Sequence, residues 1–273
     1  MTTRPRMPPI TPPDPRAVMT RHVDGPDAVL RHGDHPDHVV DVHLPTPRLG
    51  VRTRAPLAVL LHGGFWRAEH DRRHTRPLAV ALREQGYAVA TPEYRRTGAD
   101  GGWPGTFDDV ARIRSRLPGL LDDALPGLVA PRRPIVVGHS AGGHLALWWA
   151  LTGRREDAAH AVALAPVADL ARAYAENLGD GAVRDLMGGG PARHPDRYAA
   201  ADTAVLLRRW AGRRPVVVHG DADEQVPVAH SRGLVGIDLV ELPATDHFAI
   251  IDPLSPAWPH VLRAIGGRSA PCV

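Results

Sequence analysis

A serine in a glycine-flanked motif is the residue of this sequence best suited to chemistry. Ser140 is the centre of Gly-His-Ser-Ala-Gly at residues 138–142, which follows the apolar run 135–137 and precedes the apolar stretch 143–150. A tight turn from a strand into a helix lifts such a hydroxyl out of the sheet edge, and flanking glycines avoid crowding in that turn. The pattern therefore predicts a nucleophilic serine at a strand-to-helix elbow.

A second glycine motif follows another predicted strand. The apolar run 57–61 precedes His-Gly-Gly-Phe-Trp at residues 62–66. Backbone N–H groups in such a turn can face the oxygen that becomes negatively charged during acyl transfer. We expect Gly63 and Gly64 to supply these groups, together with Ala141 directly after the serine.

A serine hydroxyl is a weak nucleophile near neutral pH, so it needs a base and a group that orients the base. His247 lies in the loop after the last predicted strand, and Asp223 lies in an acid-rich loop after the run 215–219. Serine, acid and histidine thus occur in the chain order typical of sheets that carry a nucleophile elbow. We predict that Asp223 orients His247 and that His247 is the base.

Three other residues compete for these roles. Asp221 and Glu224 share the loop of Asp223, although Asp221 could instead shape the turn and Glu224 could be a solvated neighbour. His139 is a rival base by proximity to Ser140 alone, but a residue next to the nucleophile in an elbow points elsewhere.

The composition indicates a soluble, globular protein. The chain has 273 residues, of which 43% are hydrophobic and 23% are charged, which suits one large α/β core. Its net charge is only +3, and acidic residues are interspersed among the arginines, so we expect no nucleic-acid partner. No apolar run reaches the length of a membrane span, and no secretory signal is evident at the N-terminus. We therefore expect a cytoplasmic protein without a membrane partner. A homodimer is possible from the sequence.

Neither the histidines nor the cysteine predict a metal or redox centre. His32, His35 and His38 fall in a segment rich in Pro, Gly and Asp, which indicates a solvated loop, and Cys272 stands alone next to the chain end. Acyl transfer by a serine needs no metal, nucleotide or redox cofactor, and we expect none.

Strands alternate with helical stretches along the chain, which predicts an α/β fold with a mostly parallel central sheet and helices on both faces. Residues 1–20 form a leader rich in Pro, Thr and Arg that we expect to be poorly ordered, or else to lie along the surface. Residues 21–270 are predicted to form a single domain. A break in the alternation at about 167–211 predicts a small cap inserted into that domain.

These motifs resemble the α/β-hydrolase superfamily over about residues 38–262. Within it they are similar to the arylformamidase (kynurenine formamidase) and small carboxylesterase group. The His-Gly-Gly-x-Trp form at 62–66 resembles formamidases, whereas esterases like hormone-sensitive lipase tend to have a third glycine where Phe65 stands. The run Glu-Tyr-Arg-Arg at 93–96 also departs from the Tyr-Arg-Leu-Ala-Pro run of those esterases.

The resemblance implies a serine hydrolase that cleaves a small amide or formamide, such as N-formylkynurenine, through an acyl-enzyme. A short-chain carboxylesterase or deacetylase is the close alternative, whereas a peptidase and a non-catalytic binding protein fit less well. Phe65, Trp66 and Phe248 are expected to line the substrate pocket. Trp66 could stack on an aromatic substrate group, or it could pack beneath the cap.

Overall fold

The structure is a computed structural model that describes residues 14–46, 54–153 and 160–266. Its described residues form one eight-stranded sheet in the order β1-β2-β4-β3-β5-β6-β7-β8. The strands are β1 (Ala28–Arg31), β2 (Val39–His43), β3 (Ala55–Leu61), β4 (Ala88–Pro92), β5 (Val129–His139), β6 (His160–Leu164), β7 (Val216–Gly220) and β8 (Asp238–Leu242). β2 pairs antiparallel with β1 and β4, and all other neighbours are parallel. The predicted α/β fold with a mostly parallel sheet is confirmed.

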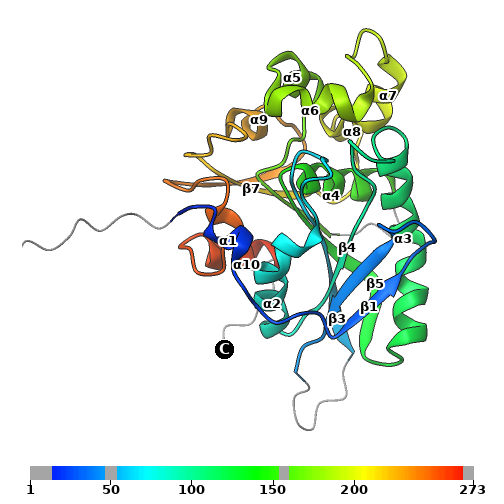
Figure 1. Cartoon of the computed structure of the whole chain (residues 1–273). Coiled ribbons are helices and arrows are strands. Elements are labelled where there is room, and N and C mark those ends of the chain that lie inside the picture. Colours follow the sequence, from blue (N-terminus) through cyan, green and yellow to red (C-terminus); the bar gives the residue numbers. More distant parts are fainter. Residues whose placement is uncertain (1–13, 47–53, 154–159, 267–273) are drawn as a thin grey trace, which may run out of the picture.

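Helices cover both faces of this sheet (Figure 1). They are α1 (Ala17–Thr20), α2 (Arg76–Glu84), α3 (Gly105–Ala124), α4 (Ala141–Thr152), α5 (Leu170–Ala175), α6 (Leu178–Met187), α7 (Pro195–Ala201), α8 (Thr203–Leu207), α9 (Ala229–Arg232) and α10 (Trp258–Gly266), with 3-10 turns η1 (Arg72–Thr75) and η3 (Ala249–Ile251). None of the described helices is long and apolar enough to cross a membrane.

Strand β3 shows how the two faces are separated. Leu57, Val59 and Leu61 pack into one apolar core with side chains of α3 and α4, while Ala58 and Leu60 pack into a second core with α2 and α10. Successive side chains of a strand point to opposite faces, so a continuous apolar run fills both cores. This is why the run 57–61 shows no polar alternation.

Parallel pairing from β3 to β8 brings the carboxyl ends of these strands to one edge of the sheet. Loops at that edge carry the residues that could do chemistry in this fold class. Gly63 follows β3, Ser140 follows β5, Asp223 follows β7 and His247 follows β8. Residues far apart in the sequence therefore converge at a single place.

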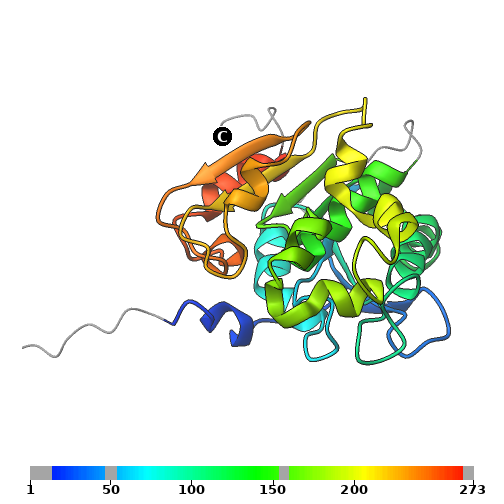
Figure 2. The same ribbon diagram turned by 90° about the horizontal axis from the view of Figure 1, so that it is seen from above.

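Four helices, α5 to α8, lie between β6 and β7, within the segment predicted as a cap. Viewed from above, they lie on the side of α3 and α4 and away from α10 (Figure 2). Gly179 of α6 contacts the loop after β3, since a Cβ atom on this glycine would lie 2.7 Å from Cδ1 of Phe65. The insertion thus borders the edge where the loops converge.

The last part of the predicted leader packs on the protein. Residues 1–13 lie outside the described residues, but residues 14–20 include α1, and Val18 is only 1% exposed in the core shared with α2 and α10. Arg21 then donates two hydrogen bonds to Asp252, at 2.5 and 2.7 Å. A buried apolar side chain and a two-pronged ion pair hold this segment in place.

Burial in the core predicts different effects of the same substitution on the free energy of unfolding at a buried and at an exposed leucine. Leu60 is fully buried in β3, whereas Leu254 is 78% exposed. We expect Leu60→Ala to lower the free energy of unfolding by about 2–5 kcal/mol, because the substitution leaves a cavity in a close-packed core. Leu254→Ala, the matched control, should change it by less than about 0.5 kcal/mol. Urea denaturation of both variants measures this, and equal losses would contradict the assignment of Leu60 to the core.

Candidate active site

Ser140 occupies the turn between β5 and α4 in a backbone conformation that side chains rarely adopt. Its φ is 55° and its ψ is −118°. The turn is held by hydrogen bonds on both sides: Ser140 donates its N–H to the carbonyl of Leu164 at 2.8 Å, and its own carbonyl accepts from His144 at 3.1 Å. A strained conformation of this kind persists only where the surroundings fix it, and it is typical of a nucleophile elbow.

Close backbone packing explains the two glycines of the motif. A Cβ atom on Gly138 would lie 2.0 Å from the carbonyl oxygen of Gly142, and one on Gly142 would lie 2.2 Å from that of Leu61. Neither position has room for any side chain. The first turn of α4 therefore lies directly against β3 and β5, which fixes where the serine hydroxyl emerges.

Asp223 and His247 are in direct contact. Nδ1 of His247 lies 2.6 Å from Oδ2 of Asp223, and both side chains are buried. The other oxygen, Oδ1, accepts backbone N–H groups from Gln225 and Val226 at 2.9 and 2.8 Å. Because a carboxylate only accepts, the proton of the imidazole lies on Nδ1 and leaves Nε2 free to accept another.

The two rival acids have other positions. Asp221 is exposed and accepts the backbone N–H of Ala244 at 2.6 Å, so it ties the turn after β7 to the turn after β8. Glu224 is exposed to solvent. Of the three acids in this loop, Asp223 is the one that reaches His247.

The surroundings of Asp223 keep it ionised. Burial opposes its charge, but hydrogen bonds from His219 and His247 outweigh burial, and the pKa of Asp223 lies well below its ordinary value. His219 is itself buried, with Nε2 2.8 Å from the carbonyl of Val226 and Nδ1 2.6 Å from Oγ of Ser231. It therefore braces the loop that carries Asp223.

The loop at 62–66 lies beside the serine. A Cβ atom on Gly63 would lie 3.1 Å from Cβ of Ser140, and Gly64 has a φ of +103° that favours glycine. His62 donates from Nδ1 to the carbonyl of Gly63 at 2.8 Å. Because a trans peptide is planar, this bond also fixes the direction of the N–H of Gly64, which points away from that carbonyl.

A buried ionic cluster supports this loop from behind. Nε2 of His62 lies 2.7 Å from Oε1 of Glu93, and Oε2 of Glu93 accepts the backbone N–H of Arg72 at 2.9 Å. Arg72 also donates twice to the buried carboxylate of Asp41, at 2.9 and 2.8 Å. Burial opposes the charge of Glu93, but His62 and Arg96 outweigh it and lower its pKa to about 2.

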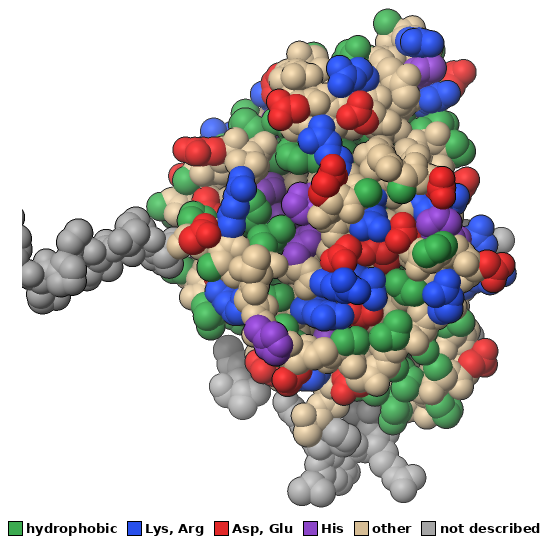
Figure 3. Space-filling model, in the orientation of Figure 1, with side chains coloured by type: hydrophobic (Ala, Val, Ile, Leu, Met, Phe, Trp, Pro, Cys, Tyr) green, Lys and Arg blue, Asp and Glu red, His purple; other side chains and the backbone are tan. Residues whose placement is uncertain are grey.

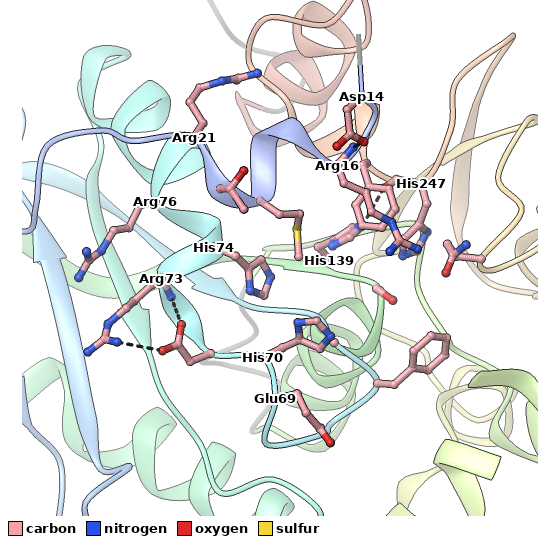
Figure 4. A pocket seen from close by; sticks show the side chains of 18 of the residues that line it. Asp14, Arg16, Arg21, Glu69, His70, Arg73, His74, Arg76, His139 and His247 are labelled. Atoms are coloured by element: carbon pink, nitrogen blue, oxygen red, sulfur yellow. Dashed lines mark hydrogen bonds and ion pairs between the residues drawn. The ribbon is translucent and has the colours of Figure 1, made fainter. Parts of the chain in front are cut away.

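A cavity of about 840 Å³ opens at this edge of the sheet and is lined by Ser140, His247 and Gly64. Figure 3 shows histidine side chains gathered at the hollow in this face, and Figure 4 shows His70, His74, His139 and His247 around it. Within the described residues, no group of three or more His, Cys, Asp or Glu side chains is arranged to hold a metal ion.

Two of the three predicted pocket residues line this cavity, and the third does not. Phe65 and Phe248 are part of its wall. Trp66 is fully buried, and its ring packs edge-on against His144 with 5.4 Å between ring centroids. The structure thus corrects the expectation that Trp66 lies in the pocket: it belongs to the core beside α4.

His139 has a contact that sequence reasoning did not predict. Its Nε2 donates to the backbone carbonyl of His247 at 2.9 Å, and the two rings lie 4.5 Å apart. Burial first, and then the neighbouring His247, hold the pKa of His139 well below its ordinary value, so the ring is neutral. In the sequence, the position of His139 next to Ser140 was the feature that drew attention to it. The structure gives His139 the role of supporting His247 and not that of an alternative base. The sequence did not indicate that the segment 14–23 lines the cavity, because most of it resembles a disordered leader in composition.

The strand order of the sheet and the arrangement of this site place the chain in the α/β-hydrolase superfamily. The profile of the BD-FAE family matches residues 40–236, and the chain belongs to that family. Over 123 residues, or 43% of the chain, it is 32% identical to the non-reducing polyketide synthase Preu3 of Preussia isomera. The match spans only 5% of the length of that synthase.

Several solved structures share the fold. Esterase B from Lactobacillus rhamnosis superimposes with a TM-score of 0.72 at 20% identity, covering 92% of this chain and 89% of the esterase. A truncated carbohydrate esterase from gut microbiota gives 0.71 at 17% identity, covering 89% and 100%. Esterase 2 of Thermogutta terrifontis, phosphonylated by sarin, gives 0.62 at 18% identity, covering 88% and 93%. At these identities the likeness is one of fold.

The contact between Asp223 and His247 predicts a large difference between two neighbouring substitutions. Asp223→Asn should lower kcat for an activated ester by about 10⁴-fold, because an amide can hold the imidazole with its proton on the wrong nitrogen. Asp221→Asn, the matched control, removes a turn contact and should leave kcat within a few-fold of the wild type. Steady-state kinetics on both variants decide this, and a larger loss in Asp221→Asn would assign the orienting role to Asp221.

The cluster around Glu93 predicts a dependence of stability on acid pH. The folded pKa of about 2 lies below the ordinary value of 4.5, so the ionised carboxyl stabilises the fold above pH 4.5 and loses this contribution as the pH falls towards 2. The difference corresponds to about 3 kcal/mol. We expect the stability advantage of the wild type over Glu93→Gln to shrink as the pH falls from 4.5 to 2.5.

Urea denaturation across this pH range measures the effect of Glu93. Glu84→Gln removes one exposed carboxylate and is the control for the change in net charge. An advantage of the wild type over Glu93→Gln that stays constant with pH would show that the cluster does not hold Glu93 ionised.

Proposed function

We propose that this protein is a serine hydrolase that cleaves small esters through an acyl-enzyme. Ser140 is the nucleophile, His247 is the base and Asp223 orients the base. The observation that carries the proposal is the buried contact between Asp223 and His247, which opens on the same cavity as the strained serine turn. Three separate loops have to be folded correctly to produce this arrangement.

The reaction follows from the proton positions. Nε2 of His247 accepts the hydroxyl proton of Ser140 while the serine oxygen attacks the acyl carbon. The oxyanion that forms is held by the N–H groups of Ala141 and Gly64, and Gly63, which lies against Ser140, is the further predicted donor. His247 then returns the proton to the leaving alcohol, and a water molecule repeats the sequence to release the acid and restore the serine.

Two observations favour an ester over a formamide. Stacking of Trp66 on an aromatic substrate group was one support for the formamide hypothesis, and Trp66 is buried away from the cavity. The structural neighbours with high TM-scores are named esterases, and esterase B was also solved with a tributyrin phosphonate inhibitor. A short-chain carboxylesterase therefore has more support than an arylformamidase, and the cavity of about 840 Å³ suits a small substrate.

A paired assay with p-nitrophenyl acetate and N-formylkynurenine tests this function. We expect kcat/KM for the ester to exceed that for the formamide, and Ser140→Ala to abolish both activities while leaving the melting temperature close to that of the wild type. A p-nitrophenyl phosphonate should add one equivalent to the wild type, detected by mass spectrometry at Ser140. Ester hydrolysis that survives Ser140→Ala would overturn the mechanism, and a much larger kcat/KM for the formamide would make the protein an arylformamidase.

A further inference from the structure

The N-terminal segment 14–23 forms one wall of the cavity that contains the serine. Its lining residues are Asp14, Arg16, Met19, Thr20, Arg21, His22 and Val23. The segment is anchored to the rest of the protein by Val18, which is buried in the core, and by Arg21, which pairs with Asp252. Figure 4 shows Asp14 and Arg16 beside His247. Side chains of this segment therefore face the same cavity as Ser140.

Arg16 is placed close to the base. Its guanidinium lies over the ring of Phe248, with Cζ 5.3 Å from the ring centroid. The ring of Phe248 in turn packs edge-on against His247, with 5.4 Å between centroids. Because His247 protonates the leaving group in the proposed reaction, side chains packed around it border the leaving-group side of the cavity. The stacking on Phe248 holds the cation on that side.

The charge of Arg16 is not neutralised within the described part of the chain. The other arginines of the cavity are each paired with a carboxylate: Arg21 with Asp252, Arg73 with Asp71 and Arg76 with Asp41. No described carboxylate forms an ion pair within 4 Å of the Arg16 guanidinium. Asp14 accepts the backbone N–H of Arg16 at 2.9 Å. Glu69, the remaining acid of the lining, is drawn on the opposite side of the cavity from Arg16 in Figure 4.

We propose that Arg16 binds a carboxylate on the leaving group of the substrate. The proposal rests on the ester hydrolase function above and narrows its substrate class to small acyl esters whose alcohol or phenol carries a negative charge. A guanidinium matches a carboxylate with two parallel N–H donors, which gives direction as well as charge. The stacked position of Arg16 reduces the freedom that the side chain would lose on binding.

Two acetyl esters that differ in one charge test the proposal. 3-Acetoxybenzoate and 3-acetoxybenzamide both transfer an acetyl group to Ser140 and release a meta-substituted phenol, but only the first carries a carboxylate. We expect kcat/KM of the wild type to favour the benzoate by about tenfold at low ionic strength, mainly through KM. Added salt should reduce this preference, since Arg16 is largely exposed.

Substitutions at Arg16 locate the preference. Arg16→Gln should bring the ratio of the two kcat/KM values to about one, Arg16→Lys should retain part of the preference, and Arg16→Glu should reverse it. The ratio of the two kcat/KM values does not depend on how much of the enzyme is folded, because the same active molecules hydrolyse both esters. Arg83→Gln is the matched control for net charge, since Arg83 pairs with the exposed Asp24 at 3.5 Å and lies outside the cavity lining. It should keep the ratio of the wild type.

The outcomes separate this inference from the proposed function. Hydrolysis of both esters at equal rates by the wild type, abolished by Ser140→Ala, would overturn the carboxylate site and leave the hydrolase intact. A preference that persists in Arg16→Gln, or that disappears equally in Arg83→Gln, would also overturn it. Failure of the wild type to hydrolyse either ester would overturn the proposed ester hydrolase itself.

Discussion

The site depends on one packing constraint, which is the contact between the first turn of α4 and the ends of β3 and β5. Gly138 and Gly142 allow backbone atoms to approach where a Cβ would lie about 2 Å from a carbonyl oxygen. Ser140 adopts its strained turn directly between these two glycines, and the loop after β3 lies against the serine. The direction of the hydroxyl and the position of the Gly64 N–H are therefore set together, by the same close approach. A side chain at either glycine would displace both.

Buried, ionised side chains connect loops that the hydrogen bonds of helices and strands do not hold. Five described carboxylates are buried, and four of them pair with a cationic or histidine side chain: Asp41, Glu93, Asp109 and Asp223. Each pair ties a loop of the active-site edge or its neighbour to another element. The fifth, Asp202, accepts only backbone N–H groups, and burial raises its pKa to about 6. A buried charge without a partner is costly, so each paired carboxylate disfavours arrangements of its loop that would separate it from its partner.

The sequence allowed most of the strands and the chemical motifs to be predicted because both are local. Apolar runs of five residues mark strands covered on both faces, and Gly-His-Ser-Ala-Gly describes a turn whose geometry needs those glycines. The pairs Asp41–Arg72 and His62–Glu93 are separated by 31 residues each, and no short pattern indicates them. The composition of the segment 14–23 resembles a leader, and only the tertiary position of Val18 reveals that it packs.

The two aromatic residues after Gly64 show where local reasoning ends. Phe65 and Trp66 follow one another in the motif, and both have positive φ, at 50° and 56°. In a strand, neighbours would point to opposite faces by rule, but in a left-handed turn their directions depend on what surrounds them. Here Phe65 lies against α6 and lines the cavity, while Trp66 packs against His144 of α4 in the core. An aromatic residue in a catalytic motif therefore indicates substrate contact only when the elements packed around the turn leave it facing the cavity. For this chain Phe65 and Phe248 are the phenylalanine side chains that line the cavity, and in the proposed function a polar side chain, Arg16, recognises the leaving group.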